Sequence, residues 1–170
     1  MIIILMFFII YFLQLNFFSW FNINGIMPNL FVLLVLFVGL FMGKSLGMVF
    51  GLAFGLFLDI MIGRKIGLSG IFLGIVGLIG EYFDKNFSKD NRFMIIIISI
   101  GCTVIYEVLN YIYNYLRFKI NVEIQPFIVN LLIENLYNTL IVLIFYGGFK
   151  KLGYYLEENF KGKTFLTRYF

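Results

Sequence analysis

The stretch GMVFGLAFGLFLDIMIGRKIGLSG, residues 47–70, decides the fold class of this chain. Gly47, Gly51 and Gly55 recur at every fourth position of an apolar run, and Asp59 follows at the same spacing. Residues four apart stay on one slowly turning face of an α-helix. In lipid, where burial of apolar surface does not drive helices together, rows of small residues let two backbones approach closely. The pattern predicts a membrane helix that packs through a smooth face, with one carboxylate near its end.

The composition of the whole chain agrees with a membrane location. Of its 170 residues, 62% are hydrophobic and 13% are charged, whereas about 25% are charged in ordinary soluble domains. A single core could not bury this much apolar surface, so lipid must be the solvent. The net charge is +4, and no basic block with interleaved aromatic residues suggests a nucleic-acid partner.

Apolar stretches long enough to cross a bilayer predict the architecture. A spanning helix needs about 17 to 25 mainly apolar residues, and six stretches qualify: residues 2–20, 26–42, 46–62, 66–83, 93–116 and 126–149. We predict an all-α integral membrane protein with six transmembrane helices in one bundle. Residues 1–170 form a single domain in this prediction, with a short cytoplasmic C-terminal tail at about 150–170.

Basic residues between the predicted spans indicate the orientation. Nine Lys and Arg residues fall on the side of the termini and four on the other side, so the positive-inside rule predicts both termini in the cytoplasm. The tail carries Leu152, Tyr155, Leu156 and Phe160 at helical spacing, which is typical of an interfacial helix. Such a helix could contact a cytoplasmic partner, or rest on anionic lipid as the basic end of the last span.

The residues available for chemistry argue against an enzyme. Cys102 is the only cysteine and the chain has no histidine, which excludes an internal disulfide, a His base and a His-ligated metal. An intramembrane aspartyl protease needs two embedded aspartates, and only Asp59 is available. We predict no catalytic residue, no metal site and no cofactor.

The glycine rows support two interpretations. Glycines of the fourth predicted span also share one face, at positions 67, 70, 74, 77 and 80. The two smooth faces could pack on each other, or one could receive a helix from another protein. Asp59 would then pair across that contact, unless Arg64 or Lys65 folds back to neutralise it. The candidate partner-binding residues are Gly47, Gly51, Gly55, Asp59, Gly63 and Gly67.

The last two predicted spans carry a second polar pattern. If they form a hairpin, a seam of amides and carboxylates brings donors opposite acceptors in the pairs Asn114 with Asn130, Asn110 with Glu134, and Glu107 with Asn138. A proton or ion pathway would use the same side chains, but amides are natural partners for clamping helices. By contrast, Glu81 lies beside Asp84 and Lys85, and we expect it to reach water at the membrane interface.

Two short motifs resemble one family. Pro28-Asn29-Leu30 opens the second predicted span, and GLFLDIMIGRKIG covers residues 55–67. They resemble the Pro-Asp-Leu and Gly-Leu-x-x-Asp-x-x-x-Gly-x-x-x-Gly signatures of the rod shape-determining protein MreD family. Asn29 stands where the family commonly has Asp, and Ser69-Gly70 replaces a polar residue followed by alanine.

The resemblance implies a function that cannot be derived from the residues alone. It implies a non-enzymatic scaffold subunit of the cell-elongation complex in the bacterial plasma membrane, which serves rod shape and peptidoglycan synthesis. The implied partners are an MreC-like single-span protein and, indirectly, actin-like MreB, RodA and a class B penicillin-binding protein.

The family is also similar in fold to the substrate-binding subunits of energy-coupling-factor vitamin transporters, which supplies an alternative function. Those subunits dock their transport partner through small residues on the first helix. Residues 2–20 contain neither Ala nor Gly, which counts against this alternative.

Overall fold

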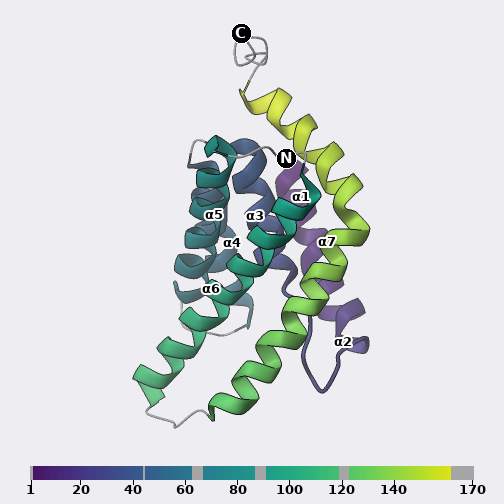
Figure 1. Ribbon diagram of the computed structural model, residues 1–170. Helices are drawn as coiled ribbons and strands as arrows, with labels where there is room; N and C mark the ends of the chain where they lie inside the picture. The colour runs from purple at the N-terminus through teal and green to yellow at the C-terminus, as the bar shows by residue number, and fades with distance from the viewer. Residues whose placement is uncertain (1, 44, 63–66, 87–90, 119–122, 162–170) are drawn as a thin grey trace.

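The computed structural model describes residues 2–43, 45–62, 67–86, 91–118 and 123–161, and almost all of them are helical (Figure 1). The first helix runs as α1 (Ile2–Phe12), the π-helical turn η1 (Leu13–Phe17) and α2 (Phe18–Trp20). The others are α3 (Leu30–Met42), α4 (Leu46–Ile62), α5 (Leu68–Asn86), α6 (Arg92–Phe118) and α7 (Ile124–Lys161). The described residues contain no strand, only an isolated bridge between Ile23 and Ile26.

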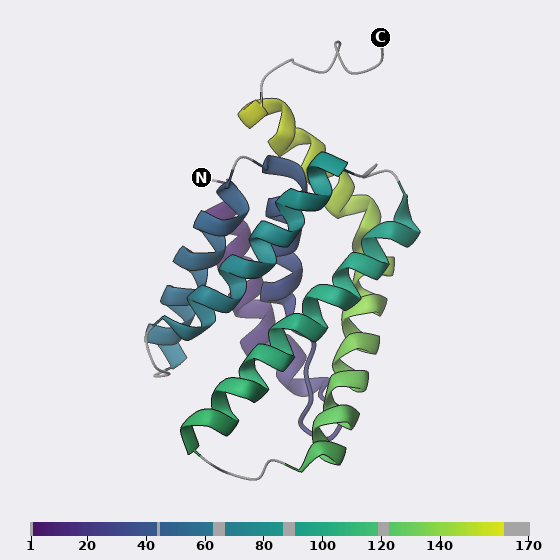
Figure 2. The same cartoon turned by 60° about the vertical axis from the view of Figure 1, so that its left-hand side comes forward.

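Helix α3 is the centre of the molecule. All thirteen of its residues are buried, because α1, α4, α5, α6 and α7 pack around it (Figures 1 and 2). Its sequence is apolar on every side, as expected for a helix without a solvent face. The helix begins at Leu30, later than the predicted start at residue 26. The reason is Asn29, whose side chain accepts a hydrogen bond from Val32 N at 3.3 Å and caps the first turn.

Within the described residues, three helices are long and apolar enough to cross a membrane: Ile2–Trp20, Arg92–Arg117 and Ile124–Glu158. Helices α3 and α4 are apolar but shorter. At a rise of about 1.5 Å per residue, α3 is about 20 Å long, less than the roughly 30 Å of a hydrocarbon core. The structure confirms a helical membrane protein, while six complete crossings stay a prediction.

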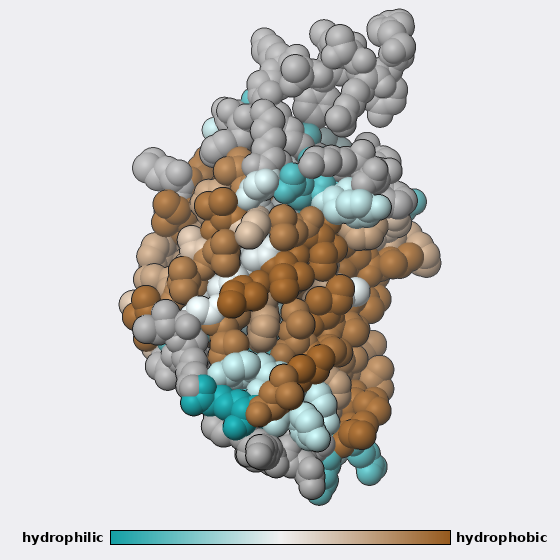
Figure 3. Space-filling model, turned by 90° about the vertical axis from the view of Figure 1, so that its left-hand side faces the viewer, coloured by the Kyte–Doolittle hydropathy of each residue, from teal (hydrophilic) through white to brown (hydrophobic). Residues whose placement is uncertain are grey.

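The surface between the two ends of the molecule is mainly apolar. Figure 3 shows brown side chains across the middle of one face and hydrophilic groups towards both ends. Large apolar residues such as Trp20, Phe93 and Ile144 are exposed by 88%, 71% and 73%. A soluble protein rarely exposes a continuous apolar surface of this kind, so this surface suits contact with lipid.

Helix α7 extends beyond the predicted end of the last span at residue 149. It continues without a break to Lys161, and Leu156 and Glu157 are buried. Gly153 lies against the ring of Phe41 at the end of α3, and the ring of Tyr154 packs edge-on against Phe41 with centroids 5.5 Å apart. The first part of the predicted tail is therefore a packed continuation of α7. Residues 162–170 lie outside the described part of the chain.

Candidate functional site

The glycine row of α4 lies against helices of the same chain. A Cβ atom on Gly51 would lie 2.5 Å from the carbonyl oxygen of Leu73 in α5. A Cβ atom on Gly47 would lie 2.6 Å from Cα of Gly39 in α3 and 2.7 Å from the carbonyl oxygen of Gly77 in α5. Real side chains do not make such short contacts, so only glycine allows three backbones to meet at this point.

This packing agrees with the interpretation that the two smooth glycine faces of the chain pack on each other. Gly55 also faces α5, because a Cβ atom on it would meet the backbone of Ser69 and Gly70. A partner helix could reach Gly47, Gly51 and Gly55 only by displacing α5. Gly63 lies outside the described residues, so partner docking on the whole set stays a prediction.

Asp59 caps the following helix. Its side chain is fully buried, and Oδ2 accepts hydrogen bonds from Gly67 N at 2.9 Å and Ser69 N at 3.1 Å. Gly67 immediately precedes α5 and has a φ of 103°, in the region that favours glycine. The carboxylate satisfies amides that have no partner inside α5 and lies at the positive end of its dipole. Arg64 and Lys65, the expected neutralising residues, lie outside the described residues.

Glu81 caps the start of the preceding helix, α4. Its Oε2 accepts a hydrogen bond from Ser45 N at 2.8 Å, directly before α4 begins at Leu46. The side chain is only 7% exposed, so the expectation that Glu81 reaches water is corrected. Because α4 and α5 are antiparallel neighbours, each helix caps the start of the other with an acid from its own last turns.

This reciprocal cap pair, Asp59 and Glu81, was not predicted from the sequence. Asp59 lies three residues before the end of α4 at Ile62, and Glu81 lies five residues before the end of α5 at Asn86. An acid in that position is unfavourable for its own helix dipole. An acid placed unfavourably for its own helix indicates that its carboxylate caps the end of a neighbouring helix. The predicted antiparallel spans were enough to suggest which helix end that is.

A second polar cluster surrounds the start of α3. Gln14, in the π-helical turn, donates through Nε2 to the carbonyl oxygen of Pro28 at 2.6 Å and accepts from Leu30 N at 3.1 Å. Asn138 of α7 accepts from Asn29 N at 2.9 Å and donates to Thr103 Oγ1 of α6 at 2.9 Å. Three chain segments are thus joined to the motif Pro28-Asn29-Leu30.

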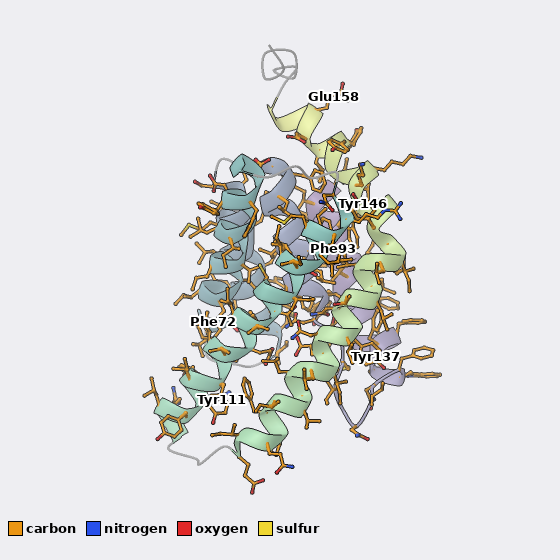
Figure 4. The ribbon with its side chains drawn as sticks, in the orientation of Figure 1. Phe72, Phe93, Tyr111, Tyr137, Tyr146 and Glu158 are labelled. Atoms are coloured by element: carbon orange, nitrogen blue, oxygen red, sulfur yellow. The ribbon has the colours of Figure 1, made fainter. Side chains whose placement is uncertain are left out.

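The predicted seam between α6 and α7 is present in part, with a different register. Asn138 pairs with Thr103 instead of Glu107, and Glu134 interacts with Glu107 and with the Asn29 side chain. The register differs from the predicted one by about one helical turn. The rings of Tyr111 and Phe127, 4.4 Å apart, join the two helices nearer their connection (Figure 4).

Burial separates the six seam residues into three pairs. Glu134 and Asn138 are buried, and Glu107 and Asn110 are half-buried. Asn114 and Asn130, the predicted outer pair, are both exposed. The seam therefore clamps α6 to α7 and α3 at one level and does not extend to the connection between the two helices.

The chemistry of the described residues is that of helix packing. No group of three or more Cys, Asp or Glu residues within them could hold a metal ion. Cys102 is buried in the hydrophobic core. The sites that the structure does define are a glycine interface, two capping acids and a clamp of amides around a buried helix start.

Together these features define a helical membrane protein built around a central buried helix, with its polar side chains used to hold helices together. Residues 1–153 match the family described as rod shape-determining protein MreD. The chain belongs to this family. No curated protein and no solved structure matched the chain.

Proposed function

We propose that this chain is a non-enzymatic scaffold subunit of the bacterial cell-elongation complex, which binds partner membrane proteins during peptidoglycan synthesis. The observation that carries the proposal is the family match over residues 1–153, which implies a role in rod shape determination. The match gives no support to the alternative function as a vitamin-transporter subunit.

The internal structure supports a scaffold role. Helices α3, α4 and α5 meet at glycine contacts that leave no space for side chains, and the cap pair closes both ends of the α4–α5 interface. A unit packed this closely has few alternative arrangements. Rigid surfaces of this kind suit a subunit that positions other proteins.

We place the protein in the bacterial plasma membrane with both termini in the cytoplasm. The start of α1 and the end of α7 lie at the same end of the molecule (Figures 1 and 2), as this orientation requires. The main proposed partner is an MreC-like single-span protein, and MreB, RodA and a class B penicillin-binding protein are indirect partners.

The partner helix needs a surface that the chain does not already use. Since α5 covers the glycine face of α4, the outward face of α4 is the accessible one in this region, and Val49, Ala53 and Ile60 lie exposed on it. Ala53 is the only alanine of the chain, so this face also offers one point of close approach.

Depletion of the protein in its own rod-shaped host tests the proposed function. We expect cells to become round, and expression of the wild-type chain to restore rods. Photo-crosslinking residues at positions 49, 53 and 60 should capture the single-span partner, with position 144 on α7 as a comparison. Depleted cells that remain rods and lose uptake of a vitamin would contradict the proposal and favour the alternative.

A further inference from the structure

Two basic side chains from different helices meet over one tyrosine ring. Arg92, the first residue of α6, lies with Cζ 5.0 Å from the ring centroid of Tyr146 in α7. Lys150, one turn further along α7, has Nζ 6.0 Å from the same centroid and 5.9 Å from that of Tyr154. Figure 4 labels Tyr146 at the level where α6 begins beside α7.

The rings hold these cations in place. Tyr146 is 5% exposed and therefore fixed in the packed core, whereas Arg92 is exposed and Lys150 is half-buried. A cation over an aromatic face is attracted by the ring quadrupole. Two like charges are thus kept on neighbouring helices, although their mutual repulsion would otherwise separate them.

The start of α6 adds a third source of positive potential. The N-terminus of a helix carries a partial positive charge, and α6 begins at Arg92 and continues for 27 residues. Asn91 caps it by accepting from Phe93 N at 3.0 Å. The position therefore favours an anion, and the two cationic side chains at the Tyr146 ring add to this positive potential.

The position relative to the membrane identifies the kind of anion. The apolar segment Arg92–Arg117 starts at Arg92, and Phe93, the next residue, is 71% exposed and apolar. The basic pair therefore lies where hydrocarbon gives way to headgroups. Basic pockets between transmembrane helices on the cytoplasmic side bind the phosphates of anionic lipids.

We propose that Arg92 and Lys150, held by Tyr146, form a binding site for the headgroup phosphate of an anionic phospholipid. The lipid lies on the surface where α6 starts beside α7, with its phosphate at the two cations and its acyl chains along exposed apolar residues such as Phe93. The site does not depend on the proposed scaffold function.

Titration of the purified full-length protein with phosphatidylglycerol tests this site, with bound lipid counted by native mass spectrometry. Arg92→Gln combined with Lys150→Gln should weaken binding about tenfold or more, since each basic residue near a membrane surface contributes measurably to attraction of anionic lipid. Lys151→Gln is the matched control, because Lys151 is exposed on the adjacent position of α7. It should stay within about twofold of wild type, since its charge is not one of the two over the Tyr146 ring.

Three results would overturn the proposal. The first is equal weakening by Lys151→Gln, which would indicate attraction to the general positive charge of the tail. The second is equally tight binding of phosphatidylcholine, and the third is competition by inorganic phosphate at the same affinity, which would indicate a site for the free ion. If the double variant does not fold, each single variant is titrated, and unchanged affinity in both overturns the proposal.

Discussion

At the scale of single residues, the two buried acids of α4 and α5 have a structural role. A carboxylate inside a membrane protein costs about 3 kcal/mol on insertion scales, so it persists only where it gains specific partners. Asp59 gains the amides of Gly67 and Ser69, and Glu81 gains the amide of Ser45. The glycines between them let the helices come close enough for both bonds.

Removal of one charge of the cap pair should destabilise the protein. We expect Asp59→Asn to lower the free energy of unfolding by about 1 kcal/mol, since the amide keeps one acceptor oxygen but loses the attraction of the helix dipole. Asp59→Leu should cost more, because it leaves the amides of Gly67 and Ser69 without an acceptor. Thermal unfolding in a mild detergent measures both changes.

Glu158 supplies the control for the cap pair, because it is an exposed acid near the end of α7. Glu158→Gln should change the unfolding temperature little, while Glu81→Gln should lower it as Asp59→Asn does. Unchanged stability of both cap variants would show that the capping bonds do not contribute to the fold.

The close glycine contacts predict a large difference in stability between alanine substitutions at two glycine positions. Gly51→Ala should cost about 1 to 3 kcal/mol, because its new methyl group meets the backbone of α5 and forces the helices apart. Gly101→Ala is the matched control, since a Cβ atom there meets no other atom within 4 Å. Folded yield and unfolding temperature of the two variants, measured side by side, check the difference; equal losses would contradict the packing.

At the scale of helices, the register of α6 against α7 depends on a third element. A hairpin model places Glu107 opposite Asn138, because it considers only the two helices and the midpoint of their connection. In the structure Asn138 is shared between Thr103 and the amide of Asn29. The start of α3 therefore selects the register, and no pattern within α6 and α7 contains that information.

Cysteine crosslinking tests this register. After replacement of Cys102, cysteines at positions 103 and 138 should be joined efficiently by a short thiol crosslinker, because the native side chains are in hydrogen-bond contact. Cysteines at 110 and 134, the pair of the original hairpin model, should react more slowly. The reverse order of efficiency would show that the original register holds.

The helices themselves were largely predictable, whereas their polar contacts were not. The apolar run at residues 46–62 predicted α4 with its observed bounds, Leu46–Ile62, because the hydrophobic pattern of a helix is a local property of the sequence. The start of α3 was misplaced because the cap at Asn29 outweighed the apolar Ile26 and Met27. The roles of Asp59 and Glu81 depend on which helix ends lie beside them, which is a tertiary property.

At the scale of the whole molecule, the structure separates an internal unit from outward surfaces. Helices α3, α4 and α5 use their glycines and acids on each other, and α6 and α7 clamp onto the start of α3. The remaining apolar surface is free for lipid and for partner helices. The family match implies a role in rod shape determination, and the scaffold function that we propose for this role needs this division.

The measurement that tests this account most directly is recovery of the proposed single-span partner per folded molecule. Wild type, Asp59→Asn, Gly51→Ala and Gly101→Ala would be purified from cells, and partner recovery divided by the amount of folded chain. The account predicts that this ratio stays constant while the amount of folded protein falls for Asp59→Asn and Gly51→Ala. A normal amount of folded chain with a clear loss of partner in these two variants would contradict it, and would show that the glycine face binds the partner after all.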